Sequence, residues 1–257
     1  MLSSPLRKCC VTSKIVPSAL MVLLKAVTLP PPPSTLSPTA SSTLPAKKNP
    51  TQAGDLVVML PDKLLHPKFV PPKLGKGIWL TLDSRIYSHL AKRGSWKSLN
   101  SKATLLGGME ELIWFQLGER VVQECQLLVD RFGEHKRLDL IGRLEEGAAE
   151  GCEGTMGYSI WLTKGKGQVE SEEQTRLGAN PIFSPKFKQE SQKERFITAI
   201  HRLASIGNNE EARLEAKYGV KHSNITLPLG IALYRLHLWT QSLATTAVDG
   251  KQQQSKS

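Results

Sequence analysis

The chain has 257 residues, and its 34 Lys and Arg against 23 Asp and Glu give a net charge of +11. A basic balance of this size indicates attraction to a polyanion, either nucleic acid or an anionic membrane surface. Only 6% of the residues are aromatic, which leaves few rings for a platform that stacks single-stranded bases.

The four cysteines argue against a disulfide-stabilised fold. Cys9 and Cys10 are adjacent, which is not the spacing of a zinc-binding pair, and Cys125 and Cys152 are isolated. So few cysteines in a chain of this length are typical of free thiols in a reducing compartment. We therefore expect an intracellular protein, with import into an organelle as an open alternative.

The charge is unevenly distributed along the chain. Residues 1–54 hold six basic and no acidic residues, and residues 61–107 hold nine basic and two acidic ones. Residues 108–180 hold eight basic and fourteen acidic residues, and residues 181–257 hold eleven and six. Two basic zones therefore flank an acidic middle. Either these zones neutralise one another across the fold, or a basic zone is free to bind a ligand.

The first 54 residues are rich in Ser, Thr and Pro. The proline run at 30–33 favours polyproline II, because proline fixes φ and lacks an amide donor. The composition predicts a disordered basic arm or, alternatively, a transit peptide that is cleaved on import. The apolar run 15–27 is shorter than the roughly 20 residues that cross a membrane. Without this arm, the net charge of the chain falls to +5.

The remainder predicts one α+β domain over residues 55–244, followed by a disordered tail at 245–257. We expect residues 55–180 to be rich in sheet and residues 181–244 to be helical.

In the first half of this domain, short apolar runs alternate with Pro and Gly. We expect a strand at 55–60, an irregular segment at 61–77 and a half-buried strand at 77–83. A helix at 84–93 follows, with Asp83 as its cap and Gly94 as its end.

Residues 109–132 fit two interpretations. Apolar residues recur every three or four positions, which indicates a helix, yet parts of the segment also resemble strands and Gly118 weakens a helix. We favour the helix. Two strands joined by a loop are expected at 136–146 and 157–167, and then a long polar excursion to residue 181.

The C-terminal third predicts three helices, at 184–207, 210–219 and about 229–243, forming a small bundle or a layer on a sheet. The sequence pattern of residues 214–225 also resembles that of a helix-turn-helix. Glu215 occupies a position where a small residue is expected, and Pro228 would interrupt the second helix. An ordinary capped helix followed by a loop is therefore preferred.

The basic zone from Lys63 to Lys102 is the segment with the clearest functional pattern, because aromatic residues are interleaved with its cations. Lys and Arg neutralise phosphates, and rings stack on bases. The predicted nucleic-acid-binding residues are Lys73, Lys76, Arg85, Lys92, Arg93, Trp96 and Lys97. The alternative is a solvated face with aromatic residues in the core.

No pattern indicates a catalytic or metal site. The six histidines form no zinc-helix pair, no serine elbow is present, and the glycine- and lysine-rich stretches lack the phosphate-loop pattern. We expect no catalytic residue, metal or cofactor, although an enzyme stays open.

The sequence therefore favours a non-enzymatic nucleic-acid-binding protein, or a structural protein of a ribonucleoprotein or capsid, of viral or organellar type. One alternative is an enzyme or assembly factor imported into an organelle. Another is a peripheral, matrix-like protein that binds anionic lipid through the same zone. A homo-oligomer is compatible with each.

Overall fold

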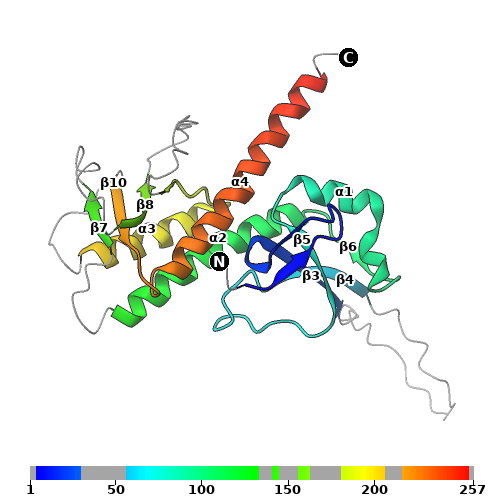
Figure 1. Ribbon diagram of the computed structural model, residues 1–257, viewed down its shortest axis with the longest axis horizontal. Helices are drawn as coiled ribbons and strands as arrows, with labels where there is room; N and C mark the ends of the chain where they lie inside the picture. Colours follow the sequence, from blue (N-terminus) through cyan, green and yellow to red (C-terminus); the bar gives the residue numbers. More distant parts are fainter. Residues whose placement is uncertain are drawn as a thin grey trace, which may run out of the picture.

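The computed structural model describes residues 4–29, 56–132, 141–144, 156–162, 181–205 and 216–254. The fold is α+β, as expected, but it contains two four-stranded sheets rather than one small sheet. The sheets lie at opposite ends of the molecule (Figure 1). Two long helices, α2 (Met109–Phe132) and α4 (Leu227–Gln254), run between the sheets. Apart from these helices, the chain divides into an N-terminal lobe, residues 4–29 and 56–107, and a C-terminal lobe built around the second sheet.

The N-terminal lobe is built on a sheet with the order β5-β3-β4-β6. The central strand β3 pairs antiparallel with β4 and β5, and β6 pairs parallel with β4. The hairpin β1–β2 packs beside the sheet, and α1 and a 3-10 turn follow β5. The strands and helices are β1 (Leu6–Lys8), β2 (Ile15–Pro17), η1 (Ser18–Leu20), β3 (Met21–Leu29), β4 (Leu56–Asp62), β5 (Gly77–Thr81), α1 (Arg85–Arg93), η2 (Ser95–Ser98) and β6 (Thr104–Leu105).

The expectation that residues 1–54 form a disordered arm is wrong for residues 4–29. The run that is too short to cross a membrane contains most of a central strand, which needs far fewer residues. Val22 and Leu24 in β3 are fully buried in the hydrophobic core. Cleavage of a transit peptide near residue 54 would remove this strand. The proline run and the expected strand start at Asp55 lie outside the described residues.

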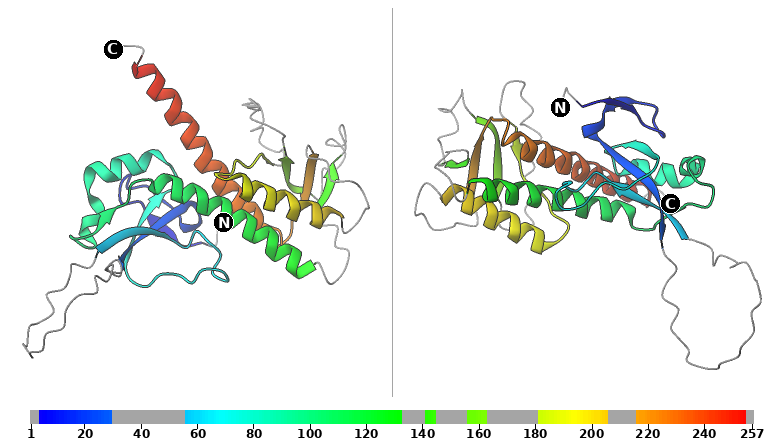
Figure 2. Two further views of the ribbon diagram at one scale, coloured as in Figure 1. Left: turned by 180° about the vertical axis from the view of Figure 1, so that it is seen from behind. Right: turned by 90° about the horizontal axis from the view of Figure 1, so that it is seen from below.

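The ambiguous segment is one helix, α2 (Met109–Phe132), which extends along both lobes (Figure 2). The favoured interpretation is therefore confirmed. Gly118 lies where Phe187 and Gln192 approach the helix, and a Cβ atom there would be 3.1 Å from an atom of each side chain. The glycine thus allows a close helix contact instead of ending α2.

The C-terminal lobe contains a sheet with the order β7-β10-β8-β9 and the helix α3. The two expected strands are confirmed as β7 and β8, but they are not neighbours, because β10 lies between them and is antiparallel to both. The helix expected from 184 begins later, at Glu190. The elements are β7 (Ile141–Leu144), β8 (Met156–Leu162), β9 (Ile182–Phe183), α3 (Glu190–Ser205) and β10 (Ala216–Lys221).

The helix expected at 210–219 is wrong from residue 216 onward, where the chain forms β10. Tyr218 and Val220 point into the core at the two-residue period of a strand. The helix-turn-helix interpretation fails for the same reason. Residues 206–215 lie outside the described part of the chain.

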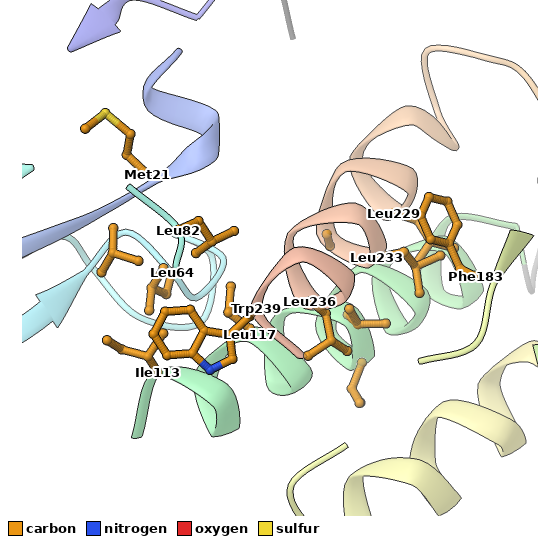
Figure 3. Close-up of a cluster of buried hydrophobic side chains, with 14 of the residues drawn as sticks. Met21, Leu64, Leu82, Ile113, Leu117, Phe183, Leu229, Leu233, Leu236 and Trp239 are labelled. Carbon is orange, nitrogen blue, oxygen red and sulfur yellow. The ribbon is translucent and has the colours of Figure 1, made fainter. Parts of the chain in front are cut away.

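The last helix, α4 (Leu227–Gln254), is longer than expected and continues through most of the tail expected from residue 245. Its buried Leu233, Leu236 and Trp239 lie between the lobes. Figure 3 shows them with Ile113 of α2 and with side chains of both lobes. The two sheets and the long helices therefore share one hydrophobic core.

Candidate polyanion-binding surface of the N-terminal lobe

The N-terminal lobe carries a large excess of positive charge. Its only carboxylate side chains are Asp62 and Asp83. All but two of its cations are exposed, the exceptions being the buried Lys25 and the half-buried Lys73. The thirteen cations of the lobe are Arg7, Lys8, Lys14, Lys25, Lys63, Lys68, Lys73, Lys76, Arg85, Lys92, Arg93, Lys97 and Lys102.

Both carboxylates of the lobe are already paired. Asp62 is buried and forms an ion pair of 3.1 Å with Lys25. Burial acts to raise the pKa of the Asp62 carboxyl, but the backbone N–H of Lys73 and the Lys25 ammonium outweigh it, so the pKa is lowered. The Arg85 guanidinium donates to both oxygens of Asp83, at 3.0 and 2.8 Å, and this hydrogen bonding lowers the pKa of Asp83. The remaining cations are therefore in excess over the lobe's own acids.

The hairpin β1–β2 brings additional cations to α1. The Arg93 guanidinium donates a hydrogen bond of 3.1 Å to the carbonyl oxygen of Val11 in the hairpin loop. Lys14 of the same loop lies close enough to Asp83, next to α1, for its charge to help lower the pKa of that carboxyl. We name the cations of these two elements and of η2 the α1–hairpin surface, which consists of Arg7, Lys8, Lys14, Arg85, Lys92, Arg93 and Lys97.

Cys9 attaches the hairpin loop to the edge of the sheet. Its buried Sγ accepts hydrogen bonds from the N–H of Thr12 at 3.5 Å, and from the N–H and hydroxyl of Thr81 at 3.4 and 3.3 Å. Burial acts to raise the pKa of this thiol, but the donors outweigh it and lower the pKa to about 7. The backbone N–H of Cys10 also donates to the Trp79 carbonyl at 3.0 Å. The cations of the hairpin are thus held by a fixed backbone.

Four of the predicted binding residues are exposed and lie in or beside α1. Lys92 and Lys97 are exposed near the end of the helix, Arg93 contacts the hairpin, and Arg85 is paired with Asp83. Lys76 is exposed in the loop before β5. Sequence reasoning missed the three cations of the hairpin, because it assigned them to a disordered arm.

Two of the predicted binding residues have structural contacts instead. The Lys73 ammonium donates to the Pro61 carbonyl at 2.9 Å. Trp96 is only 7% exposed, and its indole N–H donates to the Ala103 carbonyl at 3.2 Å. The expectation that this ring stacks on bases is therefore wrong, because the ring is part of the core. Tyr87 is also buried, edge to face with Trp239.

Cations of the C-terminal part engage the carboxylates of α2. Glu111 pairs with Lys188 at 3.2 Å and Glu119 with Arg195 at 2.9 Å, whereas Glu124 pairs within α2 itself, with Arg120 at 2.7 Å. Among the ion pairs of the described residues, the link from the N-terminal lobe to α2 is an exposed contact of 4.0 Å between Lys68 and Asp130. These acids of α2 therefore do not neutralise the α1–hairpin surface.

Other kinds of site find no support in the described ranges. These residues contain no group of three His, Cys, Asp or Glu side chains that could hold a metal ion. The cysteines described, Cys9, Cys10 and Cys125, are free. None of the described helices is both long and apolar enough to cross a membrane. Comparison with known proteins found no matching family model, no matching curated protein and no matching solved structure.

Proposed function

We propose that the protein is a non-enzymatic nucleic-acid-binding protein whose α1–hairpin surface contacts the phosphate backbone. The observation that carries this proposal is the packing of the hairpin against α1, where Arg93 donates to Val11. This contact joins cations from residues 7–14 to those from residues 85–97, which are far apart in the sequence.

The arrangement suits phosphate contacts better than base recognition. Exposed Lys and Arg release the counterions condensed on a phosphate chain, which favours binding of any sequence. Of the rings near these cations, Tyr87 and Trp96 are buried, and the half-buried Trp79 has the Arg7 guanidinium over its ring at 5.9 Å from the centroid. These rings are therefore poorly placed to stack on bases. We therefore expect similar affinity for unrelated sequences and a steep dependence on salt.

The test is a salt titration of binding to a labelled duplex and to a labelled single strand. With about four phosphates engaged, the slope of log K against log salt is expected to be about −3 to −4. Reversal of Lys14, Lys92 and Lys97 to Glu leaves the Arg93 contact intact. It should weaken binding at least about tenfold and reduce the magnitude of the slope by about 2 to 3.

A matched control changes the same amount of charge in the C-terminal lobe. Reversal of Lys186, Arg202 and Lys221 to Glu should leave most of the affinity and nearly the whole slope, because these residues lie outside the surface. If the two triple variants lose affinity equally, overall charge explains the binding and the α1–hairpin surface is not the site.

A further inference from the structure

The loop between β4 and β5 displays apolar side chains among lysines. Leu74 is 93% exposed, Phe69 is 45% exposed and Val70 is 38% exposed. Lys68 and Lys76, at the two ends of the segment KFVPPKLGK, are exposed as well. We name residues 68–76 the apolar–basic loop.

The C-terminal half of this loop is fastened to the sheet. The backbone N–H of Lys73 donates to Asp62 Oδ1 at 3.0 Å, and the Lys73 ammonium donates to the Pro61 carbonyl at 2.9 Å. The buried Lys25, itself paired with Asp62, also donates to the Lys73 carbonyl. Leu74 therefore follows a residue whose backbone donor and acceptor are both engaged.

The N-terminal half of the loop is anchored to α2. The N–H groups of Phe69 and Val70 both donate to the carbonyl of His66, and the His66 N–H donates to the Gln123 side chain at 2.8 Å. Pro71 and Pro72 restrict φ between the two anchors. The exposure of Leu74 is therefore a feature of a fixed backbone.

The chemistry of the loop distinguishes between possible ligands. A phosphate backbone offers no apolar surface to bury the three exposed apolar side chains. An apolar protein groove offers no anion to pair with the flanking lysines. An anionic bilayer uses both, because its headgroups attract lysines and its acyl boundary accepts apolar side chains. Lysine stems also lie along apolar surface while their ammonium groups stay in water.

We propose that the apolar–basic loop docks on anionic membranes. Leu74, with Phe69 and Val70, inserts into the boundary between headgroups and acyl chains, while Lys68 and Lys76 contact lipid phosphates. Lys68 exchanges its exposed contact of 4.0 Å with Asp130 for a lipid phosphate. This site differs from the α1–hairpin surface, so the protein has one surface for nucleic acid and one for lipid.

The first test is cosedimentation with phosphatidylcholine vesicles that contain about one-third phosphatidylserine, compared with phosphatidylcholine alone. The wild-type protein should bind the anionic vesicles and not the neutral ones. Replacing both Phe69 and Leu74 by Ser should weaken vesicle binding by about tenfold for each side chain. The control Leu227→Ser removes an exposed leucine at the start of α4, outside the N-terminal lobe, and should bind as the wild type does.

The second test detects insertion directly. The variant Leu74→Trp places an indole at the tip of the loop, and its emission should shift to the blue and be quenched by brominated lipid on anionic vesicles. Addition of an oligonucleotide without vesicles should cause no such shift. Unchanged emission on vesicles would overturn the proposal.

Two other outcomes would also overturn it. One is loss of nucleic-acid affinity in the Phe69, Leu74 double variant with vesicle binding intact, which would make the loop part of the nucleic-acid site. The other is a change in the sedimentation coefficient of that variant with vesicle binding intact, which would make the loop a contact between copies of the chain. Because both side chains are exposed, the melting temperature of the variant should equal that of the wild type.

Discussion

The N-terminal lobe and the rest of the molecule use charge differently. The lobe has thirteen cations and two carboxylates, whereas residues 108–257 have nineteen cations and twenty carboxylates. In the balanced part, ion pairs such as that between Arg195 and Glu119 join α3 to α2. In the lobe, the cations exceed the acids, although like charges repel and destabilise a compact state. Charge therefore supports the fold in the balanced part, and in our proposal the excess charge of the lobe serves binding.

Among the described residues, exposed apolar side chains are also concentrated in the N-terminal lobe. In the described part of the chain, seven of the nine exposed large hydrophobic residues belong to the N-terminal lobe, and they are Leu6, Ile15, Leu56, Phe69, Val70, Leu74 and Leu106. The lobe therefore combines excess positive charge with unburied apolar groups, which is typical of an interaction surface.

The largest effect is expected where an aromatic residue of the basic zone is part of the core. Trp96→Ala should destabilise the protein by about 3–5 kcal/mol, because it leaves a cavity and removes the hydrogen bond to Ala103. The ratio of affinities for single strand and duplex should stay unchanged in the folded variant. Urea denaturation measures the loss of stability, and fluorescence anisotropy of labelled single strand and duplex measures the ratio of affinities. A selective loss of single-strand binding would restore the stacking role.

Asp62 is the buried carboxylate of the lobe and pairs with the buried Lys25. Asp62→Ala should destabilise the protein by about 3 kcal/mol, because it leaves the buried Lys25 without its carboxylate partner. Urea denaturation of this variant and of the double variant Lys25→Met, Asp62→Leu separates the two effects. The double variant should recover much of the loss, and failure to recover it would show that the pair itself contributes the stability.

The same carboxyl should make stability depend on acid pH. Its pKa is lowered in the folded state, so its contribution is present above the unfolded value of about 3.9 and is lost as the pH falls through the folded value. Chemical denaturation between about pH 6 and pH 2 should therefore show a smaller loss of stability in Asp62→Asn than in the wild type. Parallel curves would contradict this assignment.

A smaller effect is expected for the ion pair between α2 and α3. Glu119→Ala should cost about 1 kcal/mol, since Arg195 is more than half exposed and solvent screens the pair. Gln192 also loses a hydrogen bond of 3.3 Å to this carboxylate. The measurement is urea denaturation at low and moderate salt, and affinity for nucleic acid should be unaltered. A clear loss of affinity would show that the balanced part also takes part in binding.

Local patterns predicted the elements whose core residues are close in sequence. The apolar stripe of α2 predicts a helix, and the apolar runs of β4 and β5 predict strands. All three segments form the expected elements. The strand β3 was missed because the Ser-, Thr- and Pro-rich composition of the first 54 residues predicts a disordered arm, and because Lys25 interrupts the apolar run of the strand. Lys25 is tolerated there through Asp62, a partner on another strand. In β10, the alternation of the buried Tyr218 and Val220 is too short a pattern to outweigh the helix that the preceding residues predict.

The candidate site was predictable only in part for the same reason. Exposed cations of α1 and η2, such as Lys92 and Lys97, follow from the sequence, because a charged residue off the apolar stripe faces solvent. The contribution of Lys14 depends on the contact between Arg93 and Val11, which are 82 residues apart. No local pattern encodes such a contact. The burial of Trp96 likewise depends on packing that forms only in the folded lobe.

The most direct test is thermal unfolding of the wild type and of the Lys14, Lys92, Lys97 to Glu variant, each with and without duplex. We expect the variant alone to melt at or above the wild-type temperature, because reversal relieves repulsion within the lobe. Duplex should raise the melting temperature of the wild type and not that of the variant. A variant that melts earlier without duplex, yet retains the full shift with it, would show that these charges support the fold and do not bind nucleic acid.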